Sequence, residues 1–176
     1  DLPTDLTSTP RTIVLNKDGA DDIVAAVIGF IDGDYQSRVV VLTSNGDGTF
    51  TEQLLATDIR TVGSPGQDFA FSDLDQNGWQ DILLSTGSGF LVWLSDQGAF
   101  PAPATFYQSP GQQLDVVALN TDAVPDVVHA SNLTINLVLG LGDGTFDLLA
   151  PVSTGGQQAK DVVAADFNGD GIDDLA

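Results

Sequence analysis

The chain has 176 residues, 42% of them hydrophobic, so it is long enough to bury a core. Its 25 acidic and five basic residues give a net charge of −20, which argues against binding to nucleic acid because the phosphates would be repelled. No apolar run approaches the length of a membrane-spanning helix, and the lack of cysteine excludes disulfides and thiolate metal sites. We expect a globular protein without membrane insertion.

The acidic residues are almost all aspartates, since Glu52 is the only glutamate. Aspartate favours turns and metal-binding loops, whereas glutamate favours helices. A surface made acidic for solubility alone would usually contain glutamate as well. We therefore interpret the acidity as turn and calcium chemistry.

Short apolar runs follow one another along the chain and are separated by turns rich in glycine and aspartate. Runs such as 81–85 and 90–94 are too short for helices and lack a period of 3.6 residues, which predicts strands. Residues 1–10 are interpreted as a tail or a strand of a preceding unit. Four strands form one unit, and we expect units at 11–60, 67–107 and 112–153, with the first two strands of a fourth at 159–176.

A nine-residue acidic loop joins the first two strands of each unit, and two copies are complete. In these copies oxygen-bearing side chains occupy positions 1, 3, 5 and 9, glycine at position 6 permits a sharp bend, and position 7 offers its carbonyl. Ca²⁺ prefers six or more oxygen ligands at about 2.3–2.6 Å. The predicted ligands are Asp73, Asp75, Asn77, the Trp79 carbonyl and Asp81 in one loop, and Asp166, Asn168, Asp170, the Ile172 carbonyl and Asp174 in the other.

Two further copies of the loop have lost the first aspartate, which is replaced by Val14 and Ala118. Pro125 also stiffens the second of these copies. Their remaining oxygen donors are weaker metal candidates, namely Asn16, Asp18 and Asp22, and Asn120, Asp122 and Asp126. The loops recur about every 50 residues, which is the length of one repeat unit.

A second motif forms turns at residues 45–50, 95–100 and 141–146. Its glycines supply the positive φ that tight hairpin turns need. Each copy ends in phenylalanine, and we expect Phe50, Phe100 and Phe146 to anchor the returning strand in a core.

Residues 163–175 and 139–146 resemble the FG-GAP/VCBS repeat family, which includes the integrin α-chain propellers and many secreted microbial proteins. The resemblance covers roughly residues 11–176. It implies an all-β fold, a β-propeller of four-stranded antiparallel blades with Ca²⁺ in the loops described above. About three and a half blades are present, fewer than in closed propellers, so the remaining blades would come from the same longer chain or from a partner subunit.

The resemblance also implies a secreted or cell-surface module for recognition or adhesion, with a protein or carbohydrate ligand. Asp32, Asp34 and Tyr35, in the longer hairpin of the first unit, are candidates for binding this ligand, although a plain long hairpin is the alternative. His129, the only histidine, lies in an apolar strand and is expected to pack rather than to catalyse. We expect no enzymatic activity. The alternatives are an accessory propeller of a larger secreted enzyme and a structural subunit that closes by strand exchange.

Overall fold

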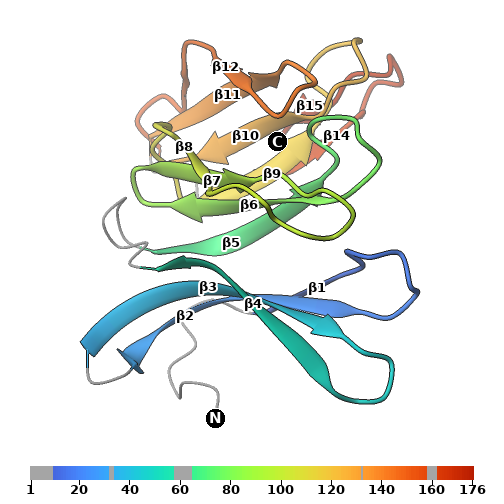
Figure 1. Cartoon of the computed structure of the whole chain (residues 1–176). Helices are drawn as coiled ribbons and strands as arrows, with labels where there is room; N and C mark the ends of the chain where they lie inside the picture. Colours follow the sequence, from blue (N-terminus) through green and yellow to red (C-terminus); the bar gives the residue numbers. More distant parts are fainter. Residues whose placement is uncertain (1–9, 32–33, 58–64, 132, 158–161) are drawn as a thin grey trace.

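The computed structural model describes residues 10–31, 34–57, 65–131, 133–157 and 162–176. Throughout these residues the chain forms β-strands and no helix, and every strand pair is antiparallel. The strands form separate sheets that follow the order of the sequence (Figure 1). The predicted all-β fold of antiparallel blades is therefore confirmed.

Each of the first three sheets contains four consecutive strands in sequence order. The first sheet comprises β1 (Arg11–Ile13), β2 (Asp22–Ile31), β3 (Asp34–Ser44) and β4 (Phe50–Thr57). The second comprises β5 (Pro65–Ser72), β6 (Asp81–Thr86), β7 (Gly89–Trp93) and β8 (Thr105–Tyr107). The third comprises β9 (Gln113–Val117), β10 (Asp126–Ala130), β11 (Thr134–Gly140) and β12 (Phe146–Leu148), and the short β13 (Val152–Ser153) also pairs with β11. In the described part of the chain the fourth sheet comprises β14 (Ala164–Ala165) and β15 (Asp174–Leu175).

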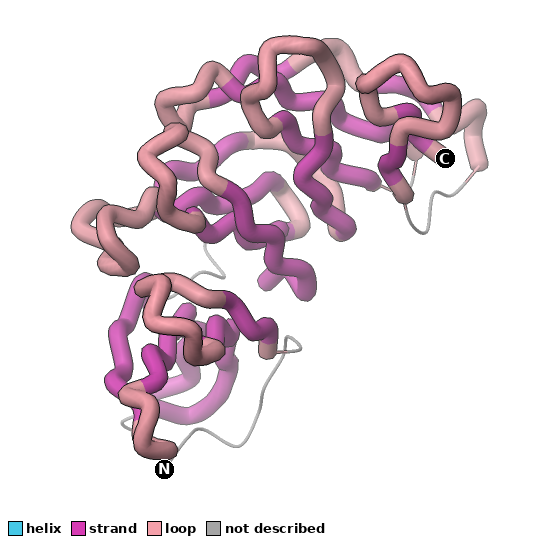
Figure 2. Tube along the Cα trace, turned by 90° about the vertical axis from the view of Figure 1, so that its right-hand side faces the viewer, coloured by secondary structure: helices cyan, strands magenta, loops and turns pink. Residues whose placement is uncertain are grey.

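Successive sheets are arranged along an arc from the N-terminal to the C-terminal end (Figure 2). The hydrophobic core lies between neighbouring sheets rather than within one sheet. One buried cluster joins the first and second sheets, another the second and third, and a third the third and fourth. The central strands are therefore covered on both faces, and every residue of β6, β7 and β10 is buried. This stacking of sheets is the packing of propeller blades.

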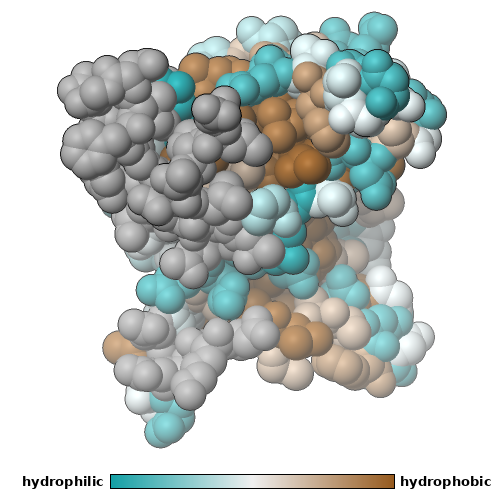
Figure 3. Space-filling view, turned by 90° about the horizontal axis from the view of Figure 1, so that it is seen from below, coloured by the Kyte–Doolittle hydropathy of each residue, from teal (hydrophilic) through white to brown (hydrophobic). Residues whose placement is uncertain are grey.

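The prediction for the turn phenylalanines is right for two residues and wrong for the third. Phe100 and Phe146 are 7% and 8% exposed, but Phe50 is 47% exposed. Phe146 packs against the rings of Phe90 and Tyr107 in the preceding blade, at centroid distances of 5.7 and 5.1 Å. Phe50 belongs to the first blade, and no described sheet precedes that blade. Hydrophobic surface is visible beside the grey atoms in the view from below (Figure 3).

His129 lies fully buried in β10, at the boundary between the second and third blades. Its ring meets the ring of Phe90 edge-on and packs against Gly111, and neither ring nitrogen has a hydrogen-bond partner. Burial lowers the pKa of His129 to about 4, an effect that the nearby backbone of Ser109 and the charge of Asp68 offset only in part. The expected packing role is confirmed.

We expect His129 to make the fold sensitive to acid. The pKa of histidine is 6.5 in the unfolded chain and about 4 in the folded protein, so as the pH falls the unfolded state binds the proton first and stability is lost between these values. From pH 7 to pH 5 this contribution lowers the free energy of unfolding by about 2 kcal/mol. Denaturant unfolding at each pH measures it. The variant His129→Phe keeps a ring in the site and should lose this part of the pH dependence, and an unchanged slope would contradict the assignment.

Candidate metal centre

The four acidic loops share one backbone frame, in which positions 1–9 begin at residues 14, 73, 118 and 166. In every loop the side-chain oxygen at position 3 accepts a hydrogen bond from the backbone N–H at position 5, and the oxygen at position 5 accepts one from position 7. These bonds measure 2.7–3.2 Å. Such Asx turns are local, so they shape the loop in the complete and the incomplete copies alike.

Position 6 has a positive φ in every loop. Gly19, Gly78 and Gly171 have φ values of 86°, 88° and 87°, and Ala123 occupies the same position of the third loop with a φ of 62°. Side chains with a Cβ are strained in this left-handed region. The third loop therefore contains a strained residue where the other loops have glycine.

Replacing Ala123 with glycine is expected to raise the free energy of unfolding by about 0.5–1 kcal/mol, because the relief of strain exceeds the added flexibility of the unfolded chain. Denaturant unfolding measures the change. The control is Ala118→Gly in the same loop, since Ala118 does not have a positive φ and gains no relief. A less stable Ala123→Gly protein would refute the interpretation.

The aspartate at position 9 joins the loop to the third strand of its own blade. Asp22, Asp81 and Asp126 are fully buried. In each, Oδ2 accepts a hydrogen bond from the backbone N–H at position 2, and Oδ1 accepts one from the backbone N–H at the end of, or just after, the third strand. The third-strand donors are Ser44, Ser95 and Gly140, and all six bonds measure 2.7–2.9 Å. Sequence reasoning treated this aspartate only as a metal ligand and missed its bridging role.

The aspartate at position 1 holds the middle of the loop. Asp73 accepts hydrogen bonds from the N–H groups of Asn77 at 2.9 Å and Gly78 at 2.7 Å. Asp166 accepts equivalent bonds, and these backbone donors, led by Gly171, lower its pKa. Valine and alanine cannot accept such bonds, so the incomplete loops lack this contact.

The second loop brings Asp73, Asp75 and Asp81 together, with one carboxylate oxygen from each lying within 4.8 Å of the others. Burial, and to a lesser extent the charges of Asp75 and Asp73, raise the pKa of Asp81 to about 6, although hydrogen bonds from Ser95 and Leu74 oppose this rise. A cation among the three carboxylates would relieve their repulsion. Because all the donors are oxygen atoms, the cluster fits a hard cation such as Ca²⁺ or Mg²⁺ rather than a softer transition metal.

A family model described as FG-GAP-like repeat matches residues 15–84 and 119–176. The chain belongs to the FG-GAP-like repeat family. Each matched segment begins at position 2 of an incomplete loop and extends through the next complete one, so the matches include all four loops except position 1 of the two incomplete ones. No curated protein matches the chain. Within the described residues no helix has the length and apolar character needed to cross a membrane.

The other FG-GAP loops do not bring three carboxylates together in the described structure, where the second loop alone forms such a group. In the fourth loop the sequence pattern is complete, and the described part of its blade comprises β14 and β15. Asp174 is partly exposed and accepts longer bonds from the Phe167 N–H at 3.2 Å and the Asn168 Nδ2 at 3.4 Å. Asp166, Asp170 and Asp174 do not form a group of three carboxylates, and the full ligand set at 166–174, which includes the oxygens of Asn168 and Ile172, stays a prediction.

Neighbouring FG-GAP loops also contact one another along one rim. The Lys17 Nζ lies 4.0 Å above the ring of Trp79, and the Gln76 side chain donates to the Ala123 carbonyl at 3.4 Å. The backbone N–H of Ala118 donates to Asp173 at 2.8 Å. A change in the conformation of one loop can therefore alter the conformation of the neighbouring loop through these contacts.

Of the residues predicted to bind a ligand, Asp32 lies outside the described residues. Asp34 and Tyr35 begin β3 and pair with Ile31 and Phe30 of β2. The long first hairpin therefore forms as regular paired strands up to its tip.

Proposed function

We propose that this chain is a calcium-stabilised part of a β-propeller that acts outside the cell as a recognition module for a protein or carbohydrate. The convergence of Asp73, Asp75 and Asp81 in the second loop is the observation that carries the proposal. The Asn77 side-chain oxygen and the Trp79 carbonyl would complete the set of protein ligands. Bound Ca²⁺ would supply positive charge that offsets part of the net charge of −20.

The role proposed for the metal is structural rather than catalytic. All the proposed ligands come from one loop, so the bound ion would fix the conformation of that loop. The second loop contacts its neighbours on both sides, through Trp79 and Gln76, so a rigid second loop would also order the rim. Recognition loops need such a rigid support. We propose accordingly that the chain is not an enzyme.

The extracellular assignment rests on the family and on the chemistry of the site. Calcium sites of extracellular modules typically have dissociation constants of about 10⁻⁴–10⁻³ M. We propose that the site of Asp73, Asp75 and Asp81 binds calcium in that range, so that it fills outside the cell and stays empty in the cytosol.

Calcium at 100 times its dissociation constant is expected to raise the free energy of unfolding by about 2.7 kcal/mol. For a chain of this length the melting temperature then rises by about 5–10 °C. Asp73→Asn should remove this rise, because it takes one charge from the cluster while nearly keeping the volume. Differential scanning calorimetry in calcium and in chelator makes the comparison.

The matched control is Asp18→Asn, which changes the charge equally in the first loop, where Val14 stands at position 1. This variant should respond to calcium as the unmodified protein does. Identical melting of the unmodified protein in calcium and in chelator would refute the calcium site. An unaltered calcium response in Asp73→Asn would refute these ligands.

A structural subunit of an extracellular assembly is the second candidate function. In such an assembly a blade of a partner subunit would cover Phe50, which is 47% exposed, as neighbouring blades cover the equivalent Phe100 and Phe146. The missing blades would then come from partner subunits rather than from the same longer chain. Native mass spectrometry of the natural protein tests this, and a longer monomer would exclude the assembly.

A further inference from the structure

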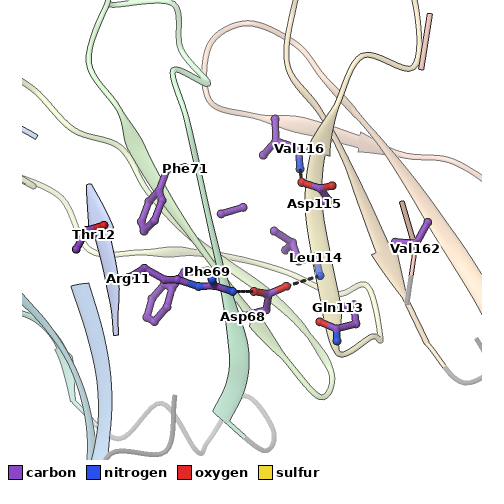
Figure 4. A pocket seen from close by; sticks show the side chains of 11 residues that line it. Arg11, Thr12, Asp68, Phe69, Phe71, Gln113, Leu114, Asp115, Val116 and Val162 are labelled. Atoms are coloured by element: carbon purple, nitrogen blue, oxygen red, sulfur yellow. Dashed lines mark hydrogen bonds and ion pairs between the residues drawn. The ribbon is translucent and has the colours of Figure 1, made fainter. Parts of the chain in front are cut away.

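A cavity of about 700 Å³ lies among the first strands β1, β5 and β9, with Val162 at one side (Figure 4). Its volume is within the range of sites that bind small molecules, about 300–1,000 Å³. Three blades contribute to its wall, and none of its lining residues belongs to an acidic loop. The cavity is thus separate from the metal centre.

The polar part of the wall offers both donors and acceptors. Arg11, which is 49% exposed, forms an ion pair with Asp68 through one Nη2 contact of 3.0 Å, and Asp68 also accepts a bond from the Leu114 N–H at 3.4 Å. The guanidinium carries five N–H donors, so most of them stay available to a ligand. The Gln113 side chain and the Thr12 hydroxyl also line the cavity, and neither makes a hydrogen bond to another described residue.

The apolar part of the wall includes an aromatic pair. Phe71 is partly buried and lies nearly parallel to Phe69, with the ring planes 6° apart and the centroids at 6.3 Å. Leu114 and Val116 of β9 contribute aliphatic surface (Figure 4). The cavity therefore combines a flat apolar surface with hydrogen-bonding side chains.

The charges restrict the ligand class. Arg11 forms an ion pair with Asp68, and the chain has a net charge of −20, so an anionic ligand is repelled. A cationic ligand would have to approach the guanidinium of Arg11. A neutral ligand avoids both kinds of charge repulsion. Hydroxyl groups are neutral, and they both donate and accept hydrogen bonds.

We propose that this cavity binds a neutral saccharide, with hydroxyl groups on Arg11, Asp68 and Gln113 and an apolar ring face on Phe71. The proposal rests on the recognition function above, to which it adds a ligand class and a place. A sugar ring has polar edges and a less polar face, which matches the two kinds of wall.

The test uses isotopically labelled protein in saturating calcium, titrated to millimolar concentrations with the methyl glycosides of glucose, galactose, mannose and N-acetylglucosamine. Backbone amide resonances report where each glycoside binds. At least one should shift amides at 11–12, 68–71 and 113–116. Gln113→Ala should weaken this binding about fivefold to tenfold, as expected for one hydrogen bond.

The matched control is Gln112→Ala, which removes the same side chain from the adjacent residue, outside the cavity wall, and should bind as the unmodified protein does. Equal weakening by both variants, shifts confined to the acidic loops, absence of shifts, or tighter binding of methyl glucuronide would overturn the proposal. Calcium-dependent melting in the same samples keeps the two proposals distinguishable. A calcium response without saccharide binding sinks only the cavity site, and the reverse result sinks only the metal centre.

Discussion

Replacing Phe146 with alanine is expected to lower the free energy of unfolding by about 3–5 kcal/mol. The side chain is 8% exposed and lies against the rings of Phe90 and Tyr107, so its removal leaves a cavity between the second and third blades. The same change at Phe50 should cost less than about 1 kcal/mol, because a half-exposed side chain leaves no closed cavity.

The two variants form a matched pair, since both residues follow the same Gly-Asp-Gly-Thr sequence. Denaturant unfolding of both proteins in calcium measures the difference. Equal losses would show that Phe50 is covered as Phe146 is. A loss below about 1 kcal/mol for Phe146→Ala would refute the packing between the blades.

This contrast marks a limit of prediction from sequence. The turn motif predicts a hairpin because glycine and aspartate act locally, and Phe146 and Phe50 have the same local sequence. Whether the ring is buried depends on the neighbouring blade, which supplies Phe90 and Tyr107 for one residue and has no described counterpart for the other. The glycine and aspartate residues determine the hairpin turn, whereas the neighbouring blade determines whether the phenylalanine ring is buried.

The acidic loops show the same division. Positions 3 and 5 could be predicted, because an Asx turn needs only the residue itself and the amide two positions later. The pattern at 166–174 is as complete as that at 73–81, yet only the second loop gathers three carboxylates. The two loops differ at position 3, which is Asp75 in one and Asn168 in the other. In the second loop the Asp81 carboxylate at position 9 is also held from outside the loop, by the backbone N–H of Ser95. No residue within the loop encodes that contact.

The bridging aspartate nevertheless left a signal in the sequence. Position 9 is aspartate in all four loops, including the two in which position 1 has become Val14 or Ala118. A residue needed only for the metal has no reason to persist where another ligand is lost. Its persistence indicates a role independent of the metal, and the buried hydrogen bonds supply that role.

Replacing Asp126 with alanine should therefore destabilise the protein by about 2–4 kcal/mol, equally in calcium and in chelator. The change leaves the N–H groups of Leu119 and Gly140 without acceptors, and each buried, unsatisfied donor costs about 1–3 kcal/mol. Asp122→Ala, in the same loop, removes only an exposed Asx contact and should cost about 1 kcal/mol or less.

Asp81→Ala separates the two roles of position 9. It should match Asp126→Ala in chelator, because it too removes two backbone contacts. In calcium its deficit should grow, since the variant also loses a metal ligand. Unfolding of both variants with and without calcium decides the matter. If Asp126→Ala loses stability only in calcium, position 9 is a metal ligand in every loop and the bridging role is wrong. If the loss of unfolding free energy is independent of calcium in both variants, the aspartates at position 9 hold strands rather than metal.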